Sequence, residues 1–332
     1  MTIYDIAKKC NVSIATVSRV LNGSDRVSEK TRAKVLAAIK EQDYAPNPFA
    51  RGLGLDSMKM VGVLCSDVAD AFYAKAVSLI EHALQKHNFD VMLSCTGESN
   101  GKDIKALRYL MQKHVDAVII IGTPFAVQGN AAALKKIAEQ IPLVAINNNY
   151  KLPGTYSIIC DEQAGMRNAV YALSNTGCRS ILYLYDALTY SGRHKLNGYK
   201  QGVLELGLDT QPALTQKTPR TFEAVAAMIH RLLKQKVPFD AILASEDILA
   251  VAAQRIARRN NHGVPVIGCN NSIIAECATP TLTSLDNRLD RLCETAIKTI
   301  IQLMQSEAPA LPSKTVFDAN LIERESFQTH KQ

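Results

Sequence analysis

The 332-residue sequence predicts a small all-α head followed by a larger α/β domain made of two lobes with parallel sheets. Three observations predict this class. Short helical patterns fill roughly the first forty residues, continuous apolar strands alternate with helices from Met60 onward, and a break near 150–156 divides that alternation in two. Continuous apolar strands separated by helices indicate parallel sheets covered on both faces.

Length and composition exclude several classes of protein. The chain exceeds one ordinary domain and has ample material for buried cores. No apolar run is long enough to span a bilayer, and the N-terminus lacks a signal-peptide pattern. The eight cysteines are scattered singly, which argues against a zinc site or a disulfide framework. We therefore expect a cytoplasmic protein with no metal and no membrane partner.

The first 21 residues predict two short helices joined by a tight turn. Thr2 and Asp5 form a near-capping box ahead of a first helix that ends near Cys10. Asn11 tolerates the left-handed backbone of such a turn, and Ser13 is a suitable N-cap for the second helix. Helix, short turn and helix is the helix-turn-helix arrangement.

The second helix has an apolar edge and a polar outer face. Val17, Val20 and Leu21 recur at helical spacing, so we expect them to be buried together. Arg19 projects on another face, and an arginine can hold O6 and N7 of guanine for about 1–3 kcal/mol of base discrimination. The alternative is an ordinary amphipathic helix with a solvated arginine. A third helix is expected over 28–42, with three buried side chains: Val35, Leu36 and Ile39.

Positive charge is concentrated in this head. The whole chain carries a formal net charge of +7. Residues 1–51 contain nine Lys and Arg against five Asp and Glu, a net charge of +4 in the first sixth of the chain. Such an excess is modest, yet it lies where contacts to DNA phosphates would be needed.

Residues 1–53 resemble the DNA-binding head of the lactose-repressor (LacI) family. The resemblance rests on Val12–Ser13, the run from Thr16 to Asn22, Val27–Ser28, Thr31–Arg32 and Val35. It implies a helix-turn-helix domain over 1–46, a hinge over 47–58, and an effector-binding and dimerisation domain of periplasmic-binding-protein-like fold over 59–332. The resemblance also implies which head residues contact DNA: Thr2, Ser13, Ile14, Ala15, Thr16, Ser18, Arg19, Asn22 and Arg26.

The hinge has its own implied role. In the family this segment becomes a helix when two protomers sit on an operator, and a leucine from each wedges into the central minor-groove step; the matching residue is Leu53. Gly52 and Gly54 lower its helix propensity by about 1 kcal/mol each, which suits a segment that is helical only on DNA. The alternative is a plain interdomain linker. The other hinge residues implied to contact DNA are Asn47, Ala50 and Arg51.

The remaining chain predicts two lobes, the first over about 59–156 and 287–313 and the second over about 157–286 and 314–332. Segments 286–304 and 316–325 are expected to return to both lobes. Strands are predicted over 60–65, 89–95, 116–122, 142–147, 157–160, 180–185, 240–244 and 264–269. Helices are predicted over 73–86, 103–113, 131–140, 162–175, 195–206, 222–234 and 248–260.

Ligands of parallel α/β sheets bind outside the carboxyl ends of the strands, so residues that follow strands are the candidates for a cleft between the lobes. The candidate effector-binding residues are Asp67, Phe72, Tyr73, Asn147, Ser191, Arg193, Lys195, Glu246, Asp247 and Asn270. Asn147 and Asn270 stand where the family commonly carries aspartate, Glu246 where it carries an amide, and Lys195 where it carries arginine. The family suggests a sugar or sugar phosphate, whereas these departures leave only a small polar effector as the prediction.

The sequence contains no catalytic constellation: no glycine-rich dinucleotide fingerprint, no phosphate loop and no serine elbow. We expect no enzyme activity, no catalytic residues and no cofactor. The resemblance implies a repressor that binds a palindromic double-stranded DNA operator as a homodimer under effector control. One alternative is a solute-binding protein without DNA function. Another is a catabolite-control-type regulator with a phosphocarrier protein as corepressor, suggested by a modest resemblance over 195–200.

Overall fold

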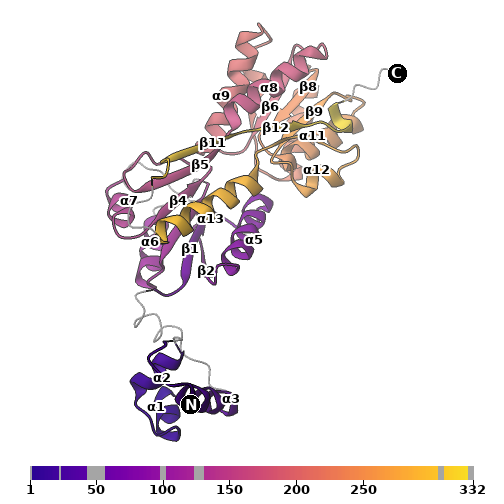
Figure 1. Ribbon diagram of the computed structural model, residues 1–332. Helices are drawn as coiled ribbons and strands as arrows, with labels where there is room; N and C mark the ends of the chain where they lie inside the picture. The colour runs from indigo at the N-terminus through magenta and orange to yellow at the C-terminus, as the bar shows by residue number, and fades with distance from the viewer. Residues whose placement is uncertain are drawn as a thin grey trace.

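The computed structural model describes residues 2–21, 24–42, 57–97, 102–122, 131–305 and 310–327. It contains a three-helix head and two α/β lobes, with both lobes built from segments far apart in the sequence (Figure 1). Among these residues, no helix is both long and apolar enough to cross a lipid bilayer.

The head consists of α1 (Ile3–Lys9), α2 (Ile14–Leu21) and α3 (Glu29–Glu41). The predicted capping box is present, because the backbone N–H of Thr2 donates to the Asp5 carboxylate at 2.8 Å. The Ser13 hydroxyl accepts from the backbone N–H of Thr16 at 3.1 Å, which fixes the start of α2. The helix-turn-helix prediction is confirmed.

The core of the head differs from the prediction most clearly at Leu36, while Leu21 and Ile39 are half-buried against it. Val17, Val20 and Val35 are buried as expected, together with Ile6 of α1. Leu36, however, is 48% exposed, and the prediction that it is buried is wrong. The inner stripe of α3 runs instead from Val35 to Ala38, because residues three apart share a helix face and Leu36 lies a quarter-turn away.

The first lobe has a six-stranded, all-parallel sheet in the order β11-β5-β4-β3-β1-β2. Helices α5 and α13 cover one face, and α6 and α7 cover the other. Its strands are β1 (Met60–Cys65), β2 (Asp90–Cys95), β3 (Ala117–Ile121), β4 (Leu143–Ile146), β5 (Thr155–Asp161) and β11 (Lys314–Asp318). Its helices are α5 (Ala71–Gln85), α6 (Lys102–Gln112), α7 (Ala131–Ala138) and α13 (Leu289–Gln305).

The second lobe has a six-stranded sheet in the order β12-β10-β9-β8-β6-β7, in which only β12 is antiparallel to its neighbour. Helices α10, α11 and α12 cover one face, and α8 and α9 cover the other. Its strands are β6 (Ile181–Tyr185), β7 (Thr215–Lys217), β8 (Ala241–Ala244), β9 (Val266–Cys269), β10 (Thr283–Asp286) and β12 (Asn320–Ile322). Its helices are α8 (Glu162–Asn175), α9 (Tyr190–Glu205), α10 (Phe222–Lys234), α11 (Asp247–Arg259) and α12 (Ile273–Cys277).

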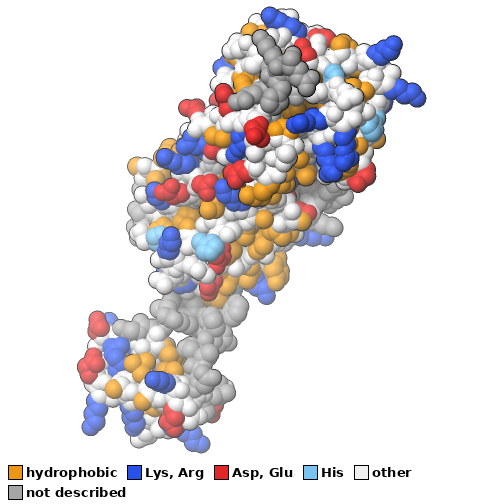
Figure 2. Space-filling view, turned by 90° about the vertical axis from the view of Figure 1, so that its right-hand side faces the viewer, with side chains coloured by type: hydrophobic (Ala, Val, Ile, Leu, Met, Phe, Trp, Pro, Cys, Tyr) orange, Lys and Arg blue, Asp and Glu red, His pale blue; other side chains and the backbone are white. Residues whose placement is uncertain are grey.

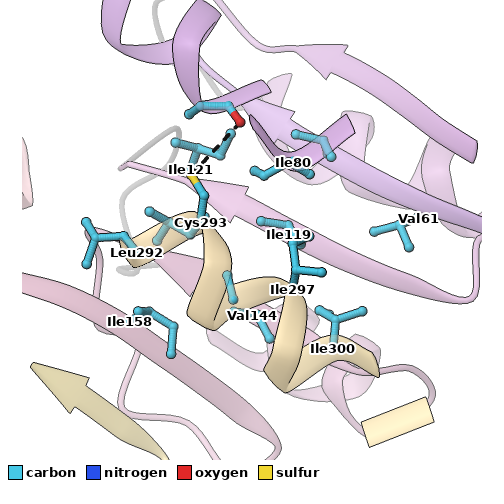
Figure 3. Packing of buried hydrophobic residues seen from close by; sticks show 14 of the residues in the cluster. Val61, Ile80, Ile119, Ile121, Val144, Ile158, Leu292, Cys293, Ile297 and Ile300 are labelled. Atoms are coloured by element: carbon cyan, nitrogen blue, oxygen red, sulfur yellow. Dashed lines mark hydrogen bonds between the residues drawn. The ribbon is translucent and has the colours of Figure 1, made fainter. Parts of the chain in front are cut away.

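The predicted boundaries between the lobes need correction. Residues 157–161 and 314–318, assigned by the sequence to the second lobe, form β5 and β11 of the first sheet. The reason is that β5 pairs with β4, and Ile158 lies in the apolar core between that sheet and α13 (Figure 3). The break at 150–156 therefore lies within the first lobe, over the end of the β4–β5 connection and the first two residues of β5. The chain crosses to the second lobe at Asp161–Glu162 and returns before α13.

The two C-terminal segments join the lobes as expected. Helix α13 packs on the first sheet, where Leu292, Ile297 and Ile300 contact the strands (Figure 3). Strand β11 then completes the first sheet and β12 the second. Three crossings therefore connect the lobes, at 161–162, 286–289 and 318–320.

Candidate functional site

The outer face of α2 is the first candidate site. Val17 and Val20 bury one side of the helix, whereas Ser13, Ile14 and Ala15 are exposed on the other. Arg19 is exposed and projects from the same outer region of the head. Thr16 and Ser18 are half-buried, and Thr2 and Arg26 are exposed. The remaining predicted DNA contacts, Asn22, Asn47, Ala50, Arg51 and Leu53, lie outside the described residues.

The second candidate site is an inner cavity of about 60 Å³ between the lobes. It lies at the carboxyl ends of β3, β4, β8 and β9, as the sequence analysis anticipated. Seven predicted residues line it: Phe72, Tyr73, Asn147, Ser191, Lys195, Glu246 and Asn270. Six further residues complete the lining: Asp70, Gly122, Glu162, Thr189, Arg220 and Asn287.

Two aromatic rings of the first lobe line the inner cavity. Phe72 and Tyr73 meet edge to face with ring centroids 5.3 Å apart, at the start of α5. Gly122 leaves room for them, since a Cβ added there would lie 2.7 Å from the Tyr73 hydroxyl. Burial raises the pKa of Tyr73, so its hydroxyl stays protonated and can donate a hydrogen bond.

A buried ionic network lies opposite the rings, centred on Lys195, which is 2% exposed. Its Nζ lies 3.5 Å from Glu162 Oε1 and 3.3 Å from Glu246 Oε1. It also donates to the Ser245 carbonyl at 3.0 Å. Burial raises the pKa of Glu246 to about 7, although Lys195 and Arg220 oppose that shift.

Two asparagines donate hydrogen bonds to the carboxyl groups of this network. Asn147 donates to Glu162 at 3.2 Å and accepts from the backbone N–H of Cys160 at the same distance. Asn270 donates to Glu246 and accepts from Asn287 at 3.0 Å. Asn147 and Asn270 have φ of 55° and 99°, a left-handed backbone that asparagine tolerates well. Amides at these strand ends therefore suit both the backbone and the neighbouring carboxylates.

Arg220 connects the two lobes. It precedes α10 of the second lobe, contacts Asp186 at 2.5 Å and lies 3.8 Å from Glu246. Its Nη1 also pairs with Asp70 of the first lobe. Asp70 is at the same time the N-cap of α5, because it accepts from the backbone N–H of Phe72 at 2.8 Å.

An outer cavity of about 500 Å³ lies on the other side of this bridge. It shares Asp70, Phe72, Arg220, Glu246 and Asn270 with the inner cavity. Its remaining wall is largely apolar and includes Ala71, Ile248, Ile274 and Leu289. Pockets that bury small ligands usually have about 300–1,000 Å³, so the outer cavity has that capacity and the inner one does not.

Three predicted residues occupy positions other than the inner cavity. Asp67 and Asp247 line the outer cavity, and both oxygens of Asp247 already accept hydrogen bonds from Ser272 and Ser284. Arg193 lines neither cavity, and its Nη1 donates to the Leu188 carbonyl at 2.7 Å. Helix α9 begins at Tyr190, earlier than predicted, so Ser191 and Lys195 share an inward face and Arg193 lies away from it.

The residues that the sequence analysis missed left only partial signals. Thr189 and Asp70 are helix N-caps, which the sequence hints at but does not connect to a cavity. Glu162 follows β5 and could have been found had that strand been assigned to the first sheet. Arg220 lies in a loop after the three-residue β7, and no sequence pattern marks it.

Two protein families match parts of the chain. Bacterial regulatory proteins of the lacI family match residues 2–47, and the periplasmic binding protein-like domain matches residues 170–327. An HTH-type transcriptional regulator of Lachnoclostridium phytofermentans is 38% identical over 98% of this chain and 99% of its own length. The regulator DegA of Bacillus subtilis is 33% identical over 86% of each chain.

Solved structures resemble the whole chain. The Lac repressor dimer bound to operator and the anti-inducer ONPF superposes with a TM-score of 0.89, at 26% identity and over 99% of both chains. The transcriptional regulator CelR in complex with cellobiose gives a TM-score of 0.70 at 28% identity, over 98% of this chain and 99% of that one.

Proposed function

This chain belongs to the LacI family of bacterial regulatory proteins, and we propose that it represses transcription as a homodimer on a twofold-symmetric operator, controlled by a small polar effector in its cleft. The main observation in support of this proposal is that one chain contains two candidate sites. A helix-turn-helix head exposes the outer face of α2, and a two-lobed domain encloses a polar cavity at its strand ends.

The head supports reading of base pairs by α2. Its exposed Ser13, Ile14, Ala15 and Arg19 form a small surface that fits the major groove, where the first turns of a recognition helix contact base edges. Thr2 and Arg26 are exposed beside this surface and suit phosphate contacts. We assign Arg19 the principal role in base discrimination.

The hinge role remains part of the proposal. Leu53 is the candidate wedge at the centre of the operator, with Asn47, Ala50 and Arg51 as its flanking contacts. Two such wedges require two protomers, and the Lac repressor is a dimer on its operator. Apolar side chains are exposed on the first lobe and suit an interface between copies (Figure 2). Leu93 of the edge strand β2 is one of the exposed apolar residues.

The cleft supports control by lobe movement. The inner cavity is too small for a whole sugar while Arg220 bridges Asp70 and Asp186. A sugar that occupies the inner cavity must therefore change the contacts between the lobes, and the first lobe carries the hinge and the head. Typical coupling between two such sites is about 1–3 kcal/mol.

Selection from random duplexes tests the proposal. The full chain is incubated with random double-stranded DNA, and the retained fraction is sequenced over several rounds. A repressor of this kind enriches a motif with twofold symmetry, whose affinity falls steeply as salt rises. Enrichment of no motif, or of a motif without twofold symmetry, contradicts the proposal.

A further inference from the structure

The charges around the cleft favour one class of ligand. Five acidic or basic side chains line the inner cavity beside the protonated Tyr73: Asp70, Glu162, Lys195, Arg220 and Glu246. Asp186 adds a fourth carboxylate through its contact with Arg220 at 2.5 Å. Four carboxyl groups therefore face two cations among the described residues. Even when Glu246, with its pKa of about 7, is protonated, three carboxylates remain against two cations, so the site keeps an excess of negative charge.

Neither cation is available to an incoming anion. Lys195 has three N–H bonds and four acceptors around it: the Ser245 carbonyl at 3.0 Å, Glu246 at 3.3 Å, Asn270 at 3.4 Å and Glu162 at 3.5 Å. A phosphate or carboxylate that approached Lys195 would have to displace one of these groups. Whichever group it displaced, it would then lie close to the carboxyl groups of Glu162 and Glu246.

Arg220 is also unavailable to an incoming anion, because it already pairs with three carboxyl groups: Asp70, Asp186 and Glu246. Two other cations near the cleft also have partners. Lys75, at the edge of the outer cavity, pairs with Asp290 at 3.0 Å, and Arg193 donates to a backbone carbonyl. In the sequence, residues 123–130, which follow β3, contain no lysine or arginine.

One buried acceptor in the cavity has no donor. Asn287 is 1% exposed and lines the inner cavity. Its Nδ2 donates to Asn270 at 3.0 Å, whereas its Oδ1 has no hydrogen-bond partner among the described residues. A buried carbonyl oxygen without a donor is unfavourable, so a ligand N–H or O–H that donates to this atom would stabilise the complex.

We propose that the effector carries a positively charged amino group, that this ammonium binds among Asp70, Glu246 and Asn287, and that anionic ligands are excluded. This inference rests on the proposed effector role of the cleft. An ammonium supplies three donors and one positive charge to a site that has spare acceptors and surplus carboxylates. It takes the place of Arg220 beside Asp70, while Arg220 keeps Asp186 of its own lobe. Amino sugars are the simplest members of this class.

The outer cavity accommodates the rest of such a ligand. The inner cavity of about 60 Å³ has room for a small group, and the adjoining outer cavity of about 500 Å³ has room for a ring. Phe72 lines both cavities and can lie against the apolar face of that ring. When the ligand ammonium replaces Arg220 beside Asp70, the ion pair between the lobes breaks. Ligand binding would thereby be coupled to the arrangement of the lobes.

A matched ligand series tests the charge preference on the full-length protein. Each of glucosamine, galactosamine and mannosamine is compared with its parent hexose, its N-acetyl derivative and the hexose 6-phosphate by isothermal titration calorimetry. We expect at least one free amine to bind at least tenfold more tightly than its neutral counterparts, and no phosphate to bind. Tighter binding of any phosphate or neutral sugar than of its amine, or binding of none of the amines, overturns the inference.

Two variants test whether the carboxylates of the cleft cause the preference for the amine. Glu246→Gln removes one carboxylate at nearly constant shape and should reduce the advantage of the amine to threefold or less. Asp70→Asn gives a second test should Glu246→Gln fail to fold. Glu139→Gln, which removes an exposed carboxylate of the first lobe outside both cavities, should leave the advantage unchanged. Equal effects of Glu246→Gln and Glu139→Gln overturn the inference.

Operator selection without any ligand separates the two proposals. An enriched symmetric motif together with preferred anionic or neutral ligands contradicts only the ammonium site. Failure to enrich any symmetric motif contradicts the repressor proposal, whatever the ligand series shows.

Discussion

Arg220 of the second lobe forms an ion pair with Asp70 of the first lobe, across the boundary between the inner and outer cavities. The same aspartate caps α5, so one side chain both starts the helix that carries Phe72 and Tyr73 and holds the opposite lobe. Any change in this contact alters the cleft and the first lobe together.

Asp70→Asn should loosen the contact between the lobes. The amide oxygen can still cap α5, whereas the charge that holds Arg220 is lost. Because Arg220 is 39% exposed, the loss is about 1 kcal/mol or less. We expect faster hydrogen exchange in the loop before α10 and at the start of α5. Asp290→Asn, which breaks the exposed Lys75 pair within the first lobe, is the control, and equal effects of the two variants would contradict the bridge.

The pKa of Glu246 predicts a pH dependence of stability. Burial raises this pKa from 4.5 to about 7, so the folded protein holds a proton that the unfolded chain releases between those values. The free energy of unfolding therefore contains a contribution from the bound proton of Glu246. This contribution is fully present below pH 4.5 and is lost as the pH rises through 7. Four charged groups act on Glu246: Lys195 and Arg220 lower its pKa, and Asp186 and Asp70 raise it.

Glu246→Gln abolishes that titration. Between pH 5 and pH 8, the stability of the wild type should fall relative to this variant by up to about 3 kcal/mol. Differential scanning calorimetry of both proteins at the two pH values measures the change. A difference in melting temperature that is the same at both pH values would show that Glu246 titrates as an ordinary carboxylate.

Gly198→Ala should destabilise the second lobe. Helices α8 and α9 pack so closely that a Cβ at Gly198 would lie 2.1 Å from the Gln163 carbonyl oxygen. The helices must separate, and overpacking of this kind lowers the free energy of unfolding by about 2 kcal/mol or more. Gly263→Ala is the matched control, because nothing lies within 4 Å of its added Cβ. Equal melting temperatures for the two variants would contradict the close approach of the helices.

Leu53→Ala tests the proposed hinge. The variant should lose affinity for the selected operator, while the melting temperature of the lobes stays unchanged. The bend of the operator should also diminish, because an intercalated side chain kinks the duplex. Circularly permuted operator fragments in a gel-shift assay measure the bend. An undiminished bend would remove Leu53 from the wedge role.

The sequence predicted the elements whose patterns are strong. Helices over 162–175 and 222–234 have the predicted bounds, and so does the strand over 60–65. The short elements β7, β10 and α12 were missed, since three to five residues carry too little periodicity to be recognised. Strand β5 was assigned to the wrong lobe because strand pairing depends on tertiary contacts and not on the order of the strands along the chain.

Site residues that follow strands were predicted from the sequence. Site residues that reach the cleft from loops were missed. Asn147 and Asn270 directly follow β4 and β9, and Glu246 lies two residues after β8, so the rule for strand ends located them. Arg220 reaches the cleft by the length of its side chain from an irregular loop. Arg193 was misjudged because the start of α9 was placed too late, which concealed that it lies on a different helix face from Lys195.

The most direct measurement is a parallel selection from random duplexes by the wild type and by Arg19→Ala. If α2 reads the operator, both proteins enrich a motif with twofold symmetry, and the variant loses preference at one base position in each half-site. Its affinity for the wild-type operator should fall by about 1–3 kcal/mol while its affinity for random DNA changes little. Identical motifs from the two proteins, with an unchanged ratio of operator to random affinity, would contradict the account.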